Sequence, residues 1–510
     1  MLNQRKLGAL LSYVSQFIHI AVNLIYTPIM LRLIGQSEYG LYQMVYSVVS
    51  YLSLLSFGFN AAYIRFYSRY NSKDDRQNIA SLNGMFLTIF TVIAVIALCA
   101  GFALLCNIES ILGEKLSFEQ IQTARTLMTL MVVNLVLAFP SSVFSCYVTS
   151  QERFVFQKLV IIAKGLFSPV ITLPFLILGY GSVAMIGVST ALTIAEFGVN
   201  IFYCVTKLKM KFRFSGFDFS LFQEMWKFTF FIFLEQIINQ VNWSVDKFLL
   251  GRYVGTASVA VYGLASTINN MYLQMSTTIS DVFVPKIHAM IAKERDNGVL
   301  TELFIKVGRV QFFVLALVLI GFISIGKPFM CLWGGSEYVQ SYYVALFLII
   351  PVSIPLMQNL GIEIQRAKNL HQIRSIAYSF IAIANVLLSI PLIKRFGATG
   401  AAAGTAIALL VGNGAFMNWY YHKKIGLNII HFWHEIFSLF PSLLLPVCIS
   451  MVISRYAQID CWAQLVLYGL IIVAAYGSSV YLWGFNDYEK GLVHAVLARR
   501  KRQKKTGIDG

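Results

Sequence analysis

The sequence predicts an all-α, polytopic membrane protein with about 14 transmembrane helices. Of its 510 residues, 57% are hydrophobic and only 12% are charged, and the mean hydropathy is +0.69. An ordinary soluble domain carries about 25% charged residues. Apolar runs repeat from end to end, and each is continuous over the ~20 residues that cross a bilayer, which excludes the alternating strands of a β-barrel.

The apolar runs form two groups along the chain. The first run follows Gln4-Arg5-Lys6, but it is too long for a secretory signal peptide and no small-x-small cleavage site follows it. The first six spans are expected at 7–33, 41–64, 80–106, 124–149, 156–178 and 183–205. The other eight are expected at 226–250, 257–282, 307–326, 339–360, 374–393, 398–421, 433–454 and 461–484.

Lysines and arginines gather in alternate loops, which orients the chain. The intervening loops, on the opposite side of the membrane, are poor in lysine and arginine: the loop 107–120 carries Glu109, Glu114 and Glu119 and only one basic residue, Lys115. The one clear exception is Lys394-Arg395, in a different short loop on that opposite side. By the positive-inside rule, both termini are expected on the cytoplasmic side of a cytoplasmic (inner) membrane. The cytoplasmic residues are Arg65, Arg69, Lys73, Arg76, Arg153, Lys158, Lys207, Lys209, Lys211, Arg213, Lys286, Lys293, Arg295, Lys306, Arg366, Lys368, Arg374, Lys423, Lys424, Arg499, Arg500, Lys501, Arg502, Lys504 and Lys505.

This orientation accounts for the net charge of +17 without nucleic acid as a partner. Lysines and arginines near the ends of spans resist translocation and touch the anionic lipid headgroups of the cytoplasmic leaflet. Membrane lipids are therefore expected partners of the basic tail.

An internal repeat divides the chain. Ile34-Gly35 followed by Tyr42 corresponds to Val254-Gly255 followed by Tyr262, and residues 181–187 correspond to 397–404. Six spans separate the copies, so both halves enter the membrane in the same direction, as parallel repeats whose facing surfaces line a substrate path. The expected domains are an N-terminal six-helix lobe at 1–215, a C-terminal six-helix lobe at 216–425, helices 13 and 14 at 426–486, and a basic cytoplasmic tail at 487–510.

Polar residues form stripes on three of the spans. A spacing of i, i+4, i+7, i+11 returns to one face of a helix, and polar groups that face hydrocarbon are costly. The stripes are expected to line a wet central cavity; hydrogen bonds between helices, without a transport role, are the alternative. The stripes are Ser12, Gln16, His19, Asn23 and Tyr26 on the first span; Glu235, Asn239, Asn242 and Asp246 on the seventh; and Asn270, Gln274, Thr277 and Asp281 on the eighth.

Charged residues within the spans are the candidates for function. Asp246, Glu235 and Asp281 each need a cation or a proton in apolar surroundings, which favours a role in cation coupling or gating. Lys164 could extend its amine to the cytoplasmic interface, or it could join Arg65 and Arg366 in a ring that binds an anion such as a phosphate.

Motifs of soluble enzymes are absent from the sequence. There is no GxxxxGK[ST], HExxH or GxSxG motif and no Cys/His metal cluster, so neither an enzyme nor a metal or other cofactor is expected. The seven cysteines lack CxxC spacing and are interpreted as packing residues. His431 and His434, with Trp433 and Glu435, are expected to anchor the thirteenth span at the membrane interface rather than to bind a metal.

Three segments carry a family resemblance that extends over essentially the whole chain. The stretches Tyr26–Tyr42, Asn242–Gly251 and Gly361–Asn369 resemble the Wzx-type polysaccharide flippases of the multidrug/oligosaccharidyl-lipid/polysaccharide exporter superfamily. The expected arrangement of six, six and two spans resembles that of the flippase branches of this superfamily rather than that of its drug exporters, which have twelve spans.

The resemblance implies a function by alternating access between two lobes. The implied substrate is an undecaprenyl-diphosphate-linked oligosaccharide, moved from the cytoplasmic to the outer leaflet for surface polysaccharide biosynthesis, with a polymerase and glycosyltransferases as partners. Arg65, Lys164 and Arg366 would then contact the diphosphate. The alternatives are a cation-coupled multidrug antiporter, a lipid II flippase, or a membrane-embedded polysaccharide polymerase or acyltransferase; the short loops disfavour the enzymes.

Overall fold

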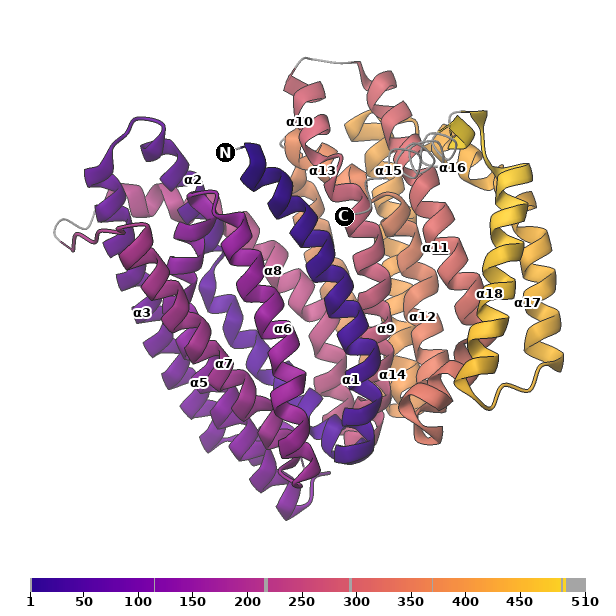
Figure 1. Ribbon diagram of the computed structural model, residues 1–510, viewed down its shortest axis with the longest axis horizontal. Coiled ribbons are helices and arrows are strands. Elements are labelled where there is room, and N and C mark those ends of the chain that lie inside the picture. The colour runs from indigo at the N-terminus through magenta and orange to yellow at the C-terminus, as the bar shows by residue number, and fades with distance from the viewer. Residues whose placement is uncertain are drawn as a thin grey trace, which may run out of the picture. The chain divides into compact units, whose positions relative to one another are not determined.

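The computed structural model describes residues 2–113, 115–214, 219–292, 296–368, 370–487 and 489–491. Every regular element among these residues is a helix, as the sequence predicts (Figure 1). Several sequence predictions lie outside the described residues. They concern Glu114, Lys293, Arg295, the domain boundary at 215/216 and the basic tail with Arg499, Arg500, Lys501, Arg502, Lys504 and Lys505.

The helices follow one another with short connections. The first are α1 (Leu2–Ser50), α2 (Phe59–Asn71), α3 (Arg76–Cys106), α4 (Ile108–Leu112), α5 (Phe118–Ser150), α6 (Phe154–Ile177) and α7 (Gly181–Phe202). Then come α8 (Phe219–Tyr253), α9 (Thr256–Asp281), α10 (Val284–Ala292), α11 (Asn297–Gly334), α12 (Val339–Met357), α13 (Asn359–Ala367) and α14 (His371–Leu409). The last are α15 (Asn418–Tyr420), α16 (Ile429–Phe437), α17 (Leu444–Tyr456) and α18 (Trp462–Ser479).

Ten segments of the described residues are long and apolar enough to cross a membrane. This finding confirms the prediction of a polytopic helical membrane protein. Two segments, Leu11–Asn71 and Gln372–Ile425, are long enough for two crossings each, and α8 and α9 also have the length for one. Counted in this way, the membrane crossings would number the expected fourteen. Both this number and the division into two six-helix lobes stay predictions.

Two glycines bend the long helices. Gly35 in α1 (φ 76°) and Gly397 in α14 (φ 60°) leave the helical conformation at the points where the sequence predicts a turn between two spans. Gly255 and Gly181, their counterparts in the internal repeat, also have positive φ, at 126° and 58°. Glycine has no Cβ and accepts this conformation without strain. Glycines with positive φ thus occur at corresponding positions of the two repeats.

The chain folds into two compact units, and the first contains Met1–Ile268, Trp333–Leu348 and Gln372–Gly412. Within it, α1 packs against α6, and α5 packs against both α3 and α7. Four members of its aromatic core, Phe59, Tyr63, Phe86 and Phe90, are each at most 2% exposed. The hydroxyl of Tyr63 donates to Oδ1 of Asn83 at 2.6 Å, so this buried phenol is paired.

The second compact unit contains Asn269–Leu332, Ile349–His371 and Asn413–Gly510. It holds an apolar cavity of about 840 Å³. The cavity is lined from several helices, among others by Tyr272, Leu315, Ile354, Trp433 and Phe437.

Candidate cation and anion sites on the membrane helices

Asp246 is the most deeply buried of the predicted site residues. It lies in α8 of the first unit and is 2% exposed. Its Oδ2 atom accepts hydrogen bonds from the hydroxyls of Tyr262 in α9, at 2.6 Å, and Thr405 in α14, at 2.7 Å. The hydroxyl of Ser389 of α14 also lies within hydrogen-bonding reach of this carboxylate, and it can donate its one proton either to Asp246 or to Oδ1 of Asn385, which is 3.2 Å away. Three helices therefore converge on one acid.

The groups around Asp246 are all oxygen ligands. A carboxylate, three hydroxyls and an amide oxygen form the kind of donor set that hard cations prefer. An ionised carboxylate among membrane helices is costly unless it binds a proton or a cation. This cluster can therefore hold a proton or a small hard cation; the role of Asp246 in coupling or gating stays a prediction. Thr405 and Ser389 were not identified as site residues from the sequence. Two signals were present: Tyr262 is part of one repeat segment, Val254-Gly255 to Tyr262, and Thr405 directly follows another, 397–404.

Glu235, 11 residues before Asp246 on α8, has a different partner. Its Oε1 atom lies 3.6 Å from Nη1 of Arg374 in α14, and the two side chains are 34% and 20% exposed. The guanidinium of Arg374 also stacks over the ring of Tyr378, 5.2 Å from its centroid. Arg374 was assigned from the sequence only to the cytoplasmic charges, so its contact with a predicted site residue is new.

Lys164 is part of a polar cluster between α6 and α7. Its Nζ atom donates to Oε2 of Glu196 at 2.8 Å and to the hydroxyl of Thr193 at 3.1 Å. The side chains of Lys164 and Glu196 are 35% and 25% exposed. Asn134 of α5 donates to Thr193 at 3.3 Å. An anion that binds Lys164 would therefore have to compete with Glu196.

The other two predicted anion-binding residues lie in different units. Arg65, in α2 of the first unit, is exposed, and its guanidinium lies 4.3 Å from the ring centroid of Phe228. Arg366, in α13 of the second unit, donates to Oε1 of Glu363 at 2.6 Å. Glu363 also lies near Asp281, and these two carboxylates repel each other. The ring of Arg65, Lys164 and Arg366 stays a prediction.

The polar stripes are also divided between the units. The stripes on α1 and α8 belong to the first unit, and the stripe on α9 belongs to the second. Asn23 of α1 lies 3.1 Å from Nδ1 of His19, so part of its stripe is bonded within the helix. The central cavity stays a prediction. Among the residues expected to line it, Gln16, Asn23, Asn242 and Gln274 are half-buried, and His19, Asn239 and Asn270 are exposed.

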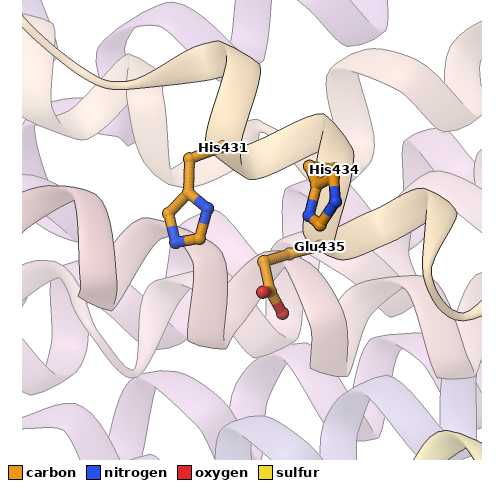
Figure 2. Close-up of side chains that lie close together, drawn as sticks. All are labelled: His431, His434 and Glu435. Carbon is orange, nitrogen blue, oxygen red and sulfur yellow. The ribbon is translucent and has the colours of Figure 1, made fainter.

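One more group of chemically active side chains lies on α16. His431, His434 and Glu435 lie close together on adjacent turns of this helix (Figure 2). Glu435 also pairs with Arg309 of α11, with Oε2 3.1 Å from Nη1.

The helices and the charged residues that they carry define a polytopic α-helical membrane protein. A solved structure of the lipid II flippase MurJ, in an inward closed conformation, is similar with a TM-score of 0.70 over 93% of this chain and 98% of that chain, at 16% identity. An inward-facing multidrug resistance MATE family transporter of the MOP superfamily is similar with a TM-score of 0.66 over 82% and 96%, at 12% identity. At these identities the likeness establishes the fold.

Sequence comparison then gives the family. Residues 7–291, more than half of the chain, match the model of the polysaccharide biosynthesis protein family, so the chain belongs to this family. The probable flippase AglR of Haloferax volcanii is 27% identical over 175 residues, which is 33% of this chain and 36% of that protein. The teichuronic acid biosynthesis protein TuaB of Bacillus subtilis is 23% identical over 145 residues, 28% of this chain and 29% of that protein. The matched part thus spans about a third of each relative's length.

Proposed function

We propose that the protein is a flippase that moves a lipid-linked oligosaccharide across the bacterial cytoplasmic membrane for surface polysaccharide biosynthesis. In this proposal the substrate carries an undecaprenyl diphosphate and passes from the cytoplasmic to the outer leaflet by alternating access. Both termini would be cytoplasmic, and a polymerase and glycosyltransferases would act after and before it. Membership of the polysaccharide biosynthesis family, the similarity to flippases and the fold support this proposal.

The observation that carries the proposal is the pairing of cations with carboxylates on the membrane helices. Lys164 with Glu196 and Arg374 with Glu235 are ion pairs that an anionic headgroup could enter by exchange. A diphosphate offers more acceptor oxygens than a carboxylate and forms strong charge-assisted bonds with such donors. Each exchange would release a carboxylate, so binding of the headgroup would change the contacts between α6 and α7 and between α8 and α14.

Coupling of transport to a cation is the second part of the proposal. The oxygen cluster around Asp246 would bind the cation or proton, and its three helices would change their packing as the ion enters or leaves. A binding event drives transport only if its affinity differs between the two states of the transporter. Asp246 is suited to this role because its hydroxyl partners come from α9 and α14 rather than from its own helix.

The test is leaflet accessibility of a lipid-linked oligosaccharide in cells or vesicles that lack and then regain this protein. Wild-type protein should relieve accumulation on the cytoplasmic face, whereas Lys164→Ala combined with Arg65→Ala should not. Arg76→Ala is a matched control, because Arg76 pairs with Asp74 where both side chains are more than 80% exposed. Its activity should equal that of the wild type.

The outcomes separate the proposed function from its rivals. An unchanged lipid distribution with and without the protein would contradict flipping, and drug resistance on overexpression would then favour the multidrug antiporter. Movement of lipid II, and not of the lipid-linked oligosaccharide, would identify the protein as a lipid II flippase.

A further inference from the structure

The charge balance around Arg309 leaves one carboxylate in excess. Arg309 of α11 binds Glu489 with two bonds, Nε to Oε1 at 2.8 Å and Nη2 to Oε2 at 2.9 Å, and these side chains are 7% and 8% exposed. This fork already matches the guanidinium with one full negative charge. Glu435, 3.1 Å from Nη1, is a second carboxylate on the same cation. The three groups together therefore carry a net charge of −1.

Two imidazoles lie beside the excess carboxylate. His431, His434 and Glu435 each offer one ligand atom, and these three atoms lie within 4.8 Å of one another. Figure 2 shows the three side chains projecting from neighbouring turns of α16. Their i, i+3, i+4 spacing places them on one face of the helix. Both imidazoles are exposed on the surface of the protein.

Other contacts hold this part of α16 in place. Arg309 fixes one oxygen of Glu435, in the way that outer partners orient the carboxylate ligands of metal sites. His434 lies in the lining of the apolar cavity, next to Trp433. Oδ1 of Asn428 accepts from the backbone N–H of His431 at 3.0 Å and so caps the first turn. The three ligand groups are therefore presented on a fixed helical turn.

We propose that His431, His434 and Glu435 form a binding site for a divalent transition-metal cation of the zinc, cobalt or nickel type. Two imidazole nitrogens and one carboxylate suit these metals, and three protein ligands leave coordination positions for water. A divalent cation would also neutralise the excess charge of Glu435, leaving Arg309, Glu489, Glu435 and the ion with a net charge of +1. The spacing of the residues is equally compatible with interfacial anchoring; the second carboxylate on Arg309 and the proximity of the ligand atoms favour a cation site.

The test measures metal binding to the full-length protein, purified through a tag without histidines and stripped with a chelator. The probes are Co²⁺, followed by its visible absorption, and Zn²⁺, followed by elemental analysis. Wild-type protein should bind one equivalent. His431→Ala and His434→Ala should each weaken metal binding by more than about tenfold. Loss of a residue that only orients a metal ligand already lowers metal affinity by about tenfold or more, and loss of a ligand itself should cost at least as much.

His288→Ala is the matched control, since His288 is an exposed histidine on α10. It should bind like the wild type. Equal binding in all variants, or no bound equivalent in the wild type, would overturn the proposal. If a variant fails to fold, Zn²⁺ should still protect His431 and His434 of the wild-type chain from modification by diethylpyrocarbonate, and unchanged modification of both would also overturn it.

Discussion

At the scale of single residues, the charge of Asp246 can be separated from its hydrogen bonds. Asp246→Asn keeps the size of the side chain and an oxygen that can accept from Tyr262 or Thr405, so the protein should fold. It removes the negative charge, so dependence of transport on a cation should be lost. Asp246→Ala should also lower the free energy of unfolding by about 1–3 kcal/mol, because two buried hydroxyls lose their acceptor.

Thermal unfolding in detergent and transport at varied sodium concentration and pH would measure these effects. Thr405→Val is a useful companion variant, because it removes one hydroxyl and leaves the carboxylate in place. Unchanged cation dependence in Asp246→Asn would refute the coupling role.

The pair of Lys164 and Glu196 tests structure against function. Lys164→Ala should destabilise the protein by about 1–3 kcal/mol, since it leaves a partly buried carboxylate without its cation. Adding Glu196→Ala should restore most of that stability. If Lys164 contacts the diphosphate, the double variant should fold and still fail to flip the substrate. Thermal unfolding and the leaflet assay, applied to both variants, decide between the two roles; recovered flipping would make the pair structural.

The sequence allowed the intramembrane charges to be predicted but not their partners. Asp246, Glu235 and Lys164 interrupt apolar runs, so hydropathy alone identifies them. Their partners depend on how distant helices pack: Thr405 is 159 residues away from Asp246, and Arg374 lies on a helix near the end of the second half. Spacing along one helix contains no information on such contacts.

At the scale of helices, one glycine sets the approach of α1 to α9. A Cβ atom at Gly40 would overlap the backbone carbonyl of Thr256, and backbone cannot move aside as a side chain can. The hydroxyls of Ser37 and Thr256 lie 3.1 Å apart at the same contact. Gly40→Ala should therefore destabilise the protein by about 1–3 kcal/mol, as overpacking does.

Gly187→Ala in α7 is the control for this prediction. A Cβ at Gly187 would meet nothing within 4 Å, so alanine should be neutral or stabilise the helix by up to about 1 kcal/mol. Thermal unfolding of both variants in the same detergent provides the comparison. Equal melting temperatures would show that α1 can move away from α9 at little cost.

The bends of α1 and α14 show what sequence predicts well at this scale. The expected turns near Gly35 and Gly397 came from the ends of apolar runs and from the repeat, and both glycines have the positive φ that such turns need. At each glycine one helix ends and another begins, so the connection is a tight turn rather than a longer loop. The pattern of hydropathy could not distinguish these two geometries.

At the scale of the whole molecule, the positive-inside rule makes a prediction about orientation. All seven native cysteines are free thiols, so a variant without them can carry single new cysteines. Lys115→Cys, between α4 and α5, should react with a membrane-impermeant maleimide in intact cells. Ser72→Cys and Glu152→Cys, after α2 and α5, should react only after permeabilisation, because their loops are expected in the cytoplasm.

The same labelling also tests how many times the bent helices cross the membrane. If α1 crosses, bends at Gly35 and returns through α2, then Gln36→Cys should be labelled from outside, like Lys115→Cys, and Ser72→Cys only from inside. A single crossing by this whole segment would put Gln36 within the bilayer and Ser72 on the outer side, with every later loop reversed. Labelling of Ser72→Cys in intact cells would therefore contradict the fourteen-span arrangement and the cytoplasmic anion site together, since Arg65 would then lie near the outer face.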